Sequence, residues 1–202
     1  MIMIQLKRNI IIFLFFLCGA IPAYATQDVK EYVDSVMQET VSIIKGQFSQ
    51  QENKRIQLRS LLEKKFDLNS MASSMLGRNK VKLSNDQIDE FNKICKNYIL
   101  TYCSKMLASY NIGNINIRMV SPNGHLCYIV RTDIIQQNNQ VLKVDFLVKK
   151  LDQEYKIANI IIEGISFITT HSVEITNVIR DKGFDYLINS LRIKVYKLRF
   201  KN

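Results

Sequence analysis

The stretch IIIEGISFITTHS, residues 160–172, joins an apolar run to a helical pattern through Glu163-Gly164. The isoleucines continue a β-like segment, residues 154–163, and glycine then permits a backbone turn that other residues resist. We expect Gly164 to make this turn and Glu163 to act as a cap or anchor beside it. Residues 167–182 have helical spacing up to Gly183. The stretch therefore predicts the end of a sheet and the start of a closing helix.

Before this stretch, apolar residues recur with a period of two, which is typical of strands. The pattern predicts strands at 114–120, 126–135, 141–150 and 154–163. Their short links favour antiparallel hairpins over parallel crossovers. In the last strand simple alternation places Tyr155, Ile157 and Ile161 on one face and Ala158, Ile160 and Ile162 on the other. A strand that is apolar on both faces needs a cover on each face, or a cavity on one.

Helices are predicted on both sides of the strands. Residues 28–49 and 52–65 have helical periodicity, Asp67 is placed to cap a short helix, and Gly77 to end it. The capping box Ser84–Gln87 opens a long helix to about residue 109, which is apolar on more than one side. Residues 192–202 alternate basic and apolar residues, which is compatible with an edge strand or a membrane-seeking tail, and from their composition we interpret them as a solvated tail. The order predicts one α+β domain over residues 26–202, with a four-stranded antiparallel sheet.

Residues 1–25 have the pattern of a cleaved signal peptide, and an uncleaved N-terminal anchor is the alternative interpretation. Lys7 and Arg8 precede an apolar segment that is too short for a confident membrane span, and small residues occupy positions 23 and 25. We therefore expect export. The net charge of +10 then falls to +8, because the leader holds these two basic residues and no acidic ones. A positive charge suits an anionic membrane surface or an acidic partner, and export argues against nucleic acid.

Three cysteines follow the leader, at 95, 103 and 127. Cys95 and Cys103 are eight residues apart in one predicted helix, about 12 Å along its axis, which is too far for a disulfide. Either of them remains able to pair with Cys127. We interpret the thiols as small buried apolar groups. No Cys/His spacing indicates a metal site.

Several segments, in order, resemble a known family. They are Phe66-Asp67-Leu68, Met71-Ala72, Leu76-Gly77-Arg78, Leu83-Ser84, Thr101-Tyr102, Tyr155-Lys156-Ile157, Ile162-Glu163-Gly164-Ile165-Ser166 and Gly183-Phe184-Asp185-Tyr186-Leu187-Ile188. This order is similar to that of the MlaC family, the periplasmic phospholipid-binding proteins of the lipid-asymmetry pathway, also called the toluene-tolerance auxiliary family. The chain departs from the family at Tyr155, where relatives have Trp, and at His171-Ser172, where they have Tyr-Arg.

The resemblance implies a fold and a function. The fold would be a cone like that of nuclear transport factors, with helices and an antiparallel sheet enclosing an apolar cavity. The function would be to carry glycerophospholipid through the periplasm, between an outer-membrane lipoprotein complex and an inner-membrane ABC transporter. It implies transient membrane contact, and no cofactor beyond the lipid ligand.

A lipid carrier needs an apolar cavity more than a precise polar site. Two acyl chains hold about 30 methylenes, each worth about 0.8 kcal/mol against water, so most of both chains must be buried. From the apolar stripes we select candidate lipid-binding residues: Phe66, Met71, Met75, Phe91, Tyr98, Tyr102, Val144, Phe146, Ile161 and Ile165. Ordinary core residues have the same spacing. The candidate partner or head-group surface is basic: Lys143, Lys149, Lys150 and Lys156.

Two other classes of function stay open. Cone-like folds also host hydrolases and isomerases, but here His171 and Ser172 are neighbours on a helix and do not pair well. Asp133 and Asp145 are the only plausible pair of internal carboxylates. We therefore expect no enzyme. A ligand-free periplasmic adaptor of an ABC transporter is the second alternative, and an empty, collapsed core would favour it.

Overall fold

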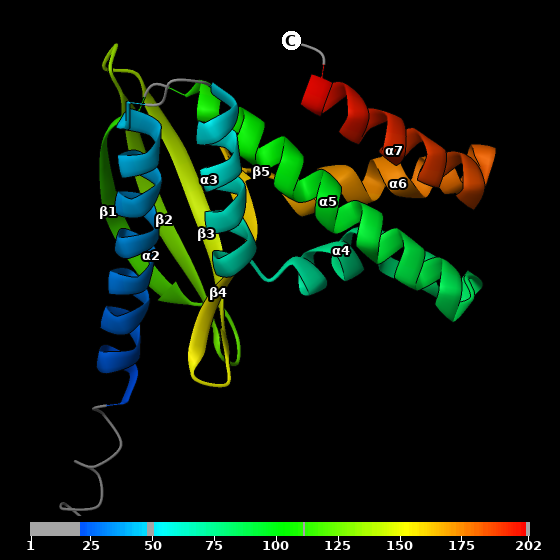
Figure 1. Ribbon diagram of the computed structural model, residues 1–202. Helices are drawn as coiled ribbons and strands as arrows, with labels where there is room; N and C mark the ends of the chain where they lie inside the picture. The colour runs from blue at the N-terminus through cyan, green and yellow to red at the C-terminus, as the bar shows by residue number, and fades with distance from the viewer. Residues whose placement is uncertain (1–20, 48–50, 111, 201–202) are drawn as a thin grey trace, which may run out of the picture.

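A computed structural model describes residues 21–47, 51–110 and 112–200 (Figure 1). Its elements are α2 (Ile21–Lys45), α3 (Gln51–Lys65), α4 (Leu68–Leu76), the 3₁₀ helix η1 (Gly77–Lys82), α5 (Asn85–Ser109), β1 (Ile112–Pro122), β2 (Cys127–Gln136), β3 (Val141–Leu151), β4 (Glu154–Ile162), β5 (Ile165–Ser166), α6 (Phe167–Lys182) and α7 (Phe184–Phe200). Most of the predicted leader, residues 1–20, lies outside the described residues. α2 begins at Ile21, and it ends four residues before the predicted 49.

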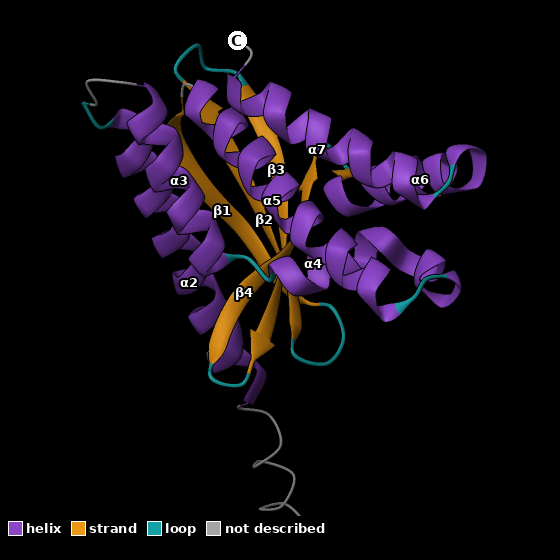
Figure 2. Ribbon diagram, turned by 45° about the vertical axis from the view of Figure 1, so that its right-hand side comes forward, coloured by secondary structure: helices purple, strands orange, loops and turns teal. Residues whose placement is uncertain are grey.

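The sheet is antiparallel with strand order β1-β2-β3-β4-β5. The predicted antiparallel α+β fold is confirmed, with five strands instead of four. The added strand, β5, is only Ile165–Ser166, too short to give a periodic signal. α2 and α3 lie across one face of the sheet, and α4, α6 and α7 gather around α5 beyond it (Figures 1 and 2).

The turn at Glu163-Gly164 links β4 to β5 in two residues. Both have positive φ, +49° and +79°, as in the two-residue hairpins that match strand twist. Glu163 also holds the start of β3, because its carboxylate Oε1 accepts from the Lys143 backbone N–H at 2.7 Å and its own N–H donates to the Lys143 carbonyl at 2.9 Å. The turn and the anchor predicted from the sequence are therefore confirmed.

Asn159 in β4 fixes where α6 begins. Its side-chain Oδ1 accepts from the backbone N–H of Ile168 at 3.2 Å, and its Nδ2 donates to Ser166 Oγ at 2.9 Å. Ser166 is the N-cap of α6, and its Oγ accepts from the Thr169 N–H at 3.1 Å. This network sets the first residue of α6, Phe167, next to the sheet.

A bulge in β4 changes which of its side chains share a face. Val148 pairs with Ile157, whereas the preceding residue of β3, Leu147, pairs with Asn159, so Ala158 is the extra residue. Such an insertion reverses the alternation on either side of it. Ile157 therefore shares a face with Ile160 and Ile162, and the predicted grouping of Ile157 with Ile161 is wrong.

Caps delimit the helices as predicted. Asp67 caps α4 by accepting from the Ser70 N–H at 3.0 Å. Ser84 and Gln87 form the capping box of α5, with Gln87 N–H to Ser84 Oγ at 3.2 Å and Ser84 N–H to Gln87 Oε1 at 3.0 Å. Gly77 and Gly183 follow α4 and α6 with positive φ. α5 begins far from the sheet and runs back toward it (Figure 1).

The predicted solvated tail is wrong, because α7 continues to Phe200. The buried residues of α7 are Phe184, Leu187, Ile188, Leu191 and Val195. They recur at spacings of three and four, so one stripe of the helix packs against the core. The basic residues between them, which dominate the tail's composition, lie on the other sides of the helix.

Candidate functional site

An apolar cavity of about 110 Å³ lies between the sheet and the helices that cover it. We call it the sheet-side cavity. β2, β3 and β4 form its floor, α2 and α5 its roof, and Phe66 and Phe167 part of its wall. Its lining residues are Val36, Met37, Thr40, Leu62, Phe66, Tyr102, Cys103, Met106, Leu107, Tyr110, Ile112, Ile134, Leu142, Val144, Phe146, Ile160, Ile162 and Phe167.

The few polar groups in this lining are hydroxyls and one thiol. Thr40 Oγ1 donates to the Val36 carbonyl at 2.7 Å, within its own helix. Burial raises the pKa of the Cys103 thiol to about 12, so the thiol is uncharged at neutral pH. No charged side chain lines the cavity. A site of this composition suits hydrocarbon and offers little to a polar substrate.

The volume sets a limit on what fits in this form of the protein. An apolar cavity of about 150 Å³ holds one benzene molecule, and sites for drug-sized ligands occupy about 300–1,000 Å³. The sheet-side cavity is smaller than both. Two acyl chains therefore require the walls to move apart.

A second cavity, of about 220 Å³, lies between α4, α5, α6 and α7. We call it the helix-side cavity. Its lining residues are Met75, Cys95, Tyr98, His171, Glu174, Ile175, Val178, Lys182, Tyr186, Leu187, Ser190, Leu191 and Lys194. Unlike the sheet-side cavity it has charged residues in its lining, among which Lys194 and Glu174 form an ion pair.

An aromatic wall of four rings separates the two cavities: Tyr98, Tyr102, Phe167 and His171. Tyr102 and Phe167 line the sheet-side cavity, with ring centroids 5.7 Å apart, while Tyr98 and His171 line the helix-side cavity, 5.5 Å apart. Phe167 and His171 are in contact across the wall, with ring centroids 4.3 Å apart and ring planes tilted by 44°. Ring contacts of this kind are individually weak, about 0.5–1.5 kcal/mol each beyond their burial.

Hydrogen bonds set the orientation of His171 in this wall. Its Nδ1 lies 2.8 Å from the Phe167 carbonyl, which only accepts, so Nδ1 carries the proton. In the neutral ring Nε2 then accepts from the Tyr98 hydroxyl at 3.0 Å. Burial, with a smaller effect from Glu174, raises the pKa of Tyr98, so this hydroxyl stays protonated. His171 is thus held as part of the wall.

The ten candidate lipid-binding residues fall into four groups. Phe66, Tyr102, Val144 and Phe146 line the sheet-side cavity; Met75 and Tyr98 line the helix-side cavity; Met71 and Phe91 are fully buried and line neither; Ile161 and Ile165 also line neither. Ile165 is 66% exposed. Their contact with lipid stays a prediction.

Several lining residues were not selected from the sequence, including Met37, Met106, Ile134, Ile160, Ile162 and Phe167. For Ile160 and Ile162 the bulge at Ala158 is the reason, since it is invisible to an alternating pattern. Phe167 is the first residue of α6, and the helical pattern of residues 167–182 does not show that its ring lines a cavity against the sheet. Its aromatic side chain, three residues after Gly164, was the available signal.

The four candidate surface lysines do not share one role in the structure. Lys149 Nζ donates to Ser70 Oγ in α4 and Lys156 Nζ to the Lys64 carbonyl at the end of α3, both at 2.7 Å. Lys150 Nζ lies 5.4 Å from the Tyr155 ring centroid. Lys143 is exposed. Lys149 and Lys156 therefore tie the sheet to the helices, and their part in recognition stays a prediction.

The groups considered for catalysis lie apart from both cavities, except His171. Asp133 forms an ion pair with Arg118 at 2.9 Å and Asp145 one with Arg131 at 3.7 Å. Within the described ranges no cluster of His, Cys, Asp and Glu is arranged to hold a metal ion, and Cys95, Cys103 and Cys127 are all free thiols. Across the same residues, no helix combines the length and the hydropathy that a membrane span requires.

Comparison with known proteins assigns the family. A family model described as the MlaC protein matches residues 34–193, most of the chain, and the chain therefore belongs to the MlaC family. Among solved structures, the fold is similar to that of a phospholipid-binding protein from Ralstonia solanacearum in complex with a phospholipid. The TM-score is 0.72, with 16% identity over 84% of this chain and 97% of that one. No curated protein sequence matches the chain significantly.

Proposed function

We propose that this member of the MlaC family is a periplasmic carrier that holds the acyl chains of a glycerophospholipid in the sheet-side cavity. The observation that carries the proposal is this cavity, which lies between the sheet, α2 and α5 and has no charged residue in its lining. The phospholipid in the similar Ralstonia protein supports the same ligand class.

Loading requires the cavity to widen. The aromatic wall is the boundary between the two cavities, and its rings come from α5 and the first turns of α6. In the proposed loading step Tyr102 and Phe167 separate and the sheet-side and helix-side cavities join. The acyl chains replace the lost ring contacts with contacts of their own, so opening is offset by burial of hydrocarbon.

The carrier exchanges lipid between an outer-membrane lipoprotein complex and an inner-membrane ABC transporter, through transient contact with a membrane or with these partners. This part of the proposal rests on family membership and on the predicted leader. The positive charge of the chain is suited to anionic head groups and acidic partner surfaces.

A second candidate function is a ligand-free adaptor of the transporter. The small volume of the sheet-side cavity, about 110 Å³, is the observation that favours it. An adaptor would use its surface alone, and its cavity would remain closed.

A transfer assay separates the two functions. Purified protein is incubated with donor vesicles that contain a labelled phospholipid, isolated, and then mixed with unlabelled acceptor vesicles. A carrier takes up about one lipid per chain and delivers it to the acceptors. A protein that stays lipid-free at every vesicle concentration contradicts the carrier and leaves the adaptor.

A further inference from the structure

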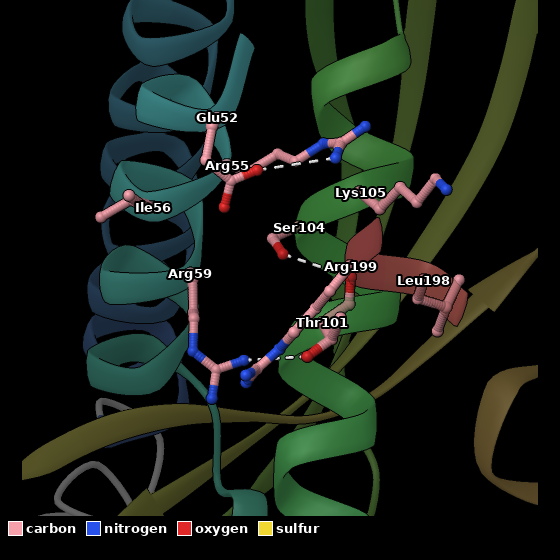
Figure 3. A pocket seen from close by; sticks show the side chains of 9 residues that line it. All are labelled: Glu52, Arg55, Ile56, Arg59, Thr101, Ser104, Lys105, Leu198 and Arg199. Atoms are coloured by element: carbon pink, nitrogen blue, oxygen red, sulfur yellow. Dashed lines mark hydrogen bonds and ion pairs between the residues drawn. The ribbon is translucent and has the colours of Figure 1, made fainter. Parts of the chain in front are cut away.

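A basic groove lies between α3, α5 and the end of α7 (Figure 3). Its volume is about 50 Å³, and its lining residues are Glu52, Arg55, Ile56, Arg59, Thr101, Ser104, Lys105, Leu198 and Arg199. On α5, successive residues are rotated by about 100°. Thr101, Ser104 and Lys105 therefore point to a different side of the helix from Tyr102 and Met106, which line the sheet-side cavity. The groove is a separate site.

Two arginines from distant parts of the chain meet in this groove. Arg59 Nη2 and Arg199 Nη2 both donate to Asn97 Oδ1, at 3.0 and 2.8 Å, and Arg59 Nη1 donates to Thr101 Oγ1 at 3.1 Å. Figure 3 shows the two guanidinium groups close together between α3 and α5. Among the described residues neither has a carboxylate within ion-pair distance. Burial and the neighbouring Arg199 lower the pKa of Arg59, against a smaller opposing effect of Glu63.

Arg55 adds an unused donor to the groove. Its Nε is buried and has no hydrogen-bond partner among the described residues. Its Nη1 lies 3.6 Å from Glu52, whose side chain is 61% exposed and is the one carboxylate in the lining. Three arginines of the lining, Arg55, Arg59 and Arg199, thus share a single, well-solvated carboxylate in that lining. Like charges held together around a buried donor are costly unless an anion is bound.

We infer that the basic groove binds a phosphate group, either as free phosphate or as the phosphodiester of a lipid head group. Guanidinium groups match phosphate oxygens with paired, charge-assisted hydrogen bonds, and the unpartnered Nε–H of Arg55 is a further donor. The volume suits one small oxyanion and excludes a chain of hydrocarbon. The inference does not depend on the carrier function, since a phosphate site would stand even if both cavities held no lipid.

The first arm of the test measures inorganic phosphate binding by calorimetry at constant ionic strength. We expect saturable binding of one phosphate per chain. Arg59→Gln and Arg199→Gln should each weaken it at least about tenfold, the loss of one charge-assisted hydrogen-bonding group. Arg180→Gln is the matched control, because Arg180 is an exposed residue of α6 whose ion pair is with the adjacent Asp181.

The second arm identifies the source of the phosphate. Vesicles of phosphatidylglycerol are sedimented with the protein, with and without inorganic phosphate. If phosphate releases the protein and Arg199→Gln abolishes binding to the vesicles, the source is a lipid head group; if phosphate binds but vesicle binding is unchanged, it is free phosphate.

The absence of saturable phosphate binding overturns the inference, as does an equal loss of affinity in Arg180→Gln. Arg55→Gln provides an independent variant if Arg59→Gln fails to fold, as judged by circular dichroism.

Discussion

Ile161 and Ile162 are neighbours in β4 whose side chains leave the sheet in opposite directions. Ile162 pairs with Val144 and lines the sheet-side cavity, whereas Ile161 pairs with Asp145 and does not. The candidate chosen from the sequence was Ile161. Alternation has the correct period, but a single bulge at Ala158 shifts its phase, and no feature of residues 154–163 marks the bulge.

This difference gives a paired prediction for lipid binding. Ile162→Trp places a large ring in the sheet-side cavity, so we expect severalfold less lipid taken up from vesicles, and a destabilisation of about 1–3 kcal/mol from overpacking. Ile161→Trp is the matched control and should retain lipid uptake. Equal loss in both variants would mean that the cavity is not where the chains bind.

Burial also predicts how readily each of the three thiols reacts with an alkylating reagent. It raises the pKa of Cys95 and Cys103 to about 12 from an ordinary 9.0, so both are protonated at pH 8 and should resist alkylation. Cys127 is partly exposed and should react. Mass spectrometry after treatment with iodoacetamide at pH 8 should find the label at Cys127; rapid labelling of Cys95 or Cys103 in the native protein would contradict this packing.

The same pKa shifts predict how the stability of the fold changes at alkaline pH. Because the folded-state pKa of these thiols is above the unfolded value, their protonated form favours folding. Their contribution to stability is complete below about pH 9 and is lost as the pH rises toward 12. The unfolding midpoint in urea should therefore fall over this range.

At the scale of elements, α7 shows how composition misleads where periodicity does not. Residues 192–202 are rich in Lys and Arg, which suggested a tail, but Leu187, Leu191 and Val195 form a stripe at a spacing of four that is buried. Because residues 192–202 were interpreted apart from the apolar residues that precede them, the single helix from Phe184 to Phe200 was not predicted. In contrast, the capping box of α5 and the Glu163-Gly164 turn were predictable, because each depends on neighbouring residues alone.

The packing of α7 predicts that substitutions on its buried and exposed sides differ in their effect on the free energy of unfolding. Leu191 is 5% exposed and Ile193 is 53% exposed. Leu191→Ala should lower the free energy of unfolding by about 2–5 kcal/mol, and Ile193→Ala by about 0.5 kcal/mol or less. Urea unfolding followed by circular dichroism measures both. Similar small effects of the two substitutions would restore the interpretation as a solvated tail.

At the scale of the whole molecule, the sites are made by residues that are far apart in the chain. The sheet-side cavity joins α2 to the first residue of α6, and the basic groove joins Arg55 and Arg59 to Arg199. Sequence patterns predict which face of an element is apolar, but not which faces meet. The α+β class, the strand pairing and the family were therefore accessible from the sequence, whereas the aromatic wall and the groove required the fold.

At this scale, binding of a lipid should raise the thermal stability of the folded protein. A ligand that binds only the folded state at about 100 times its Kd adds about 2.7 kcal/mol. For a domain of this size each 1 kcal/mol shifts Tm by about 2–4 °C. Protein stripped of lipid with detergent should therefore melt roughly 5–10 °C below the lipid-bound protein, and adding phospholipid vesicles should restore the higher Tm. Identical melting curves would indicate that the stripped protein lost no specific ligand.

The most direct test of the lipid-carrier account is native mass spectrometry of the protein purified from the periplasm of a host cell, with lipid identification after extraction. The account predicts a mass increase equal to one glycerophospholipid per chain, reduced in Ile162→Trp and retained in Ile161→Trp. A lipid-free mass for the unaltered protein, together with no uptake from vesicles, would contradict it.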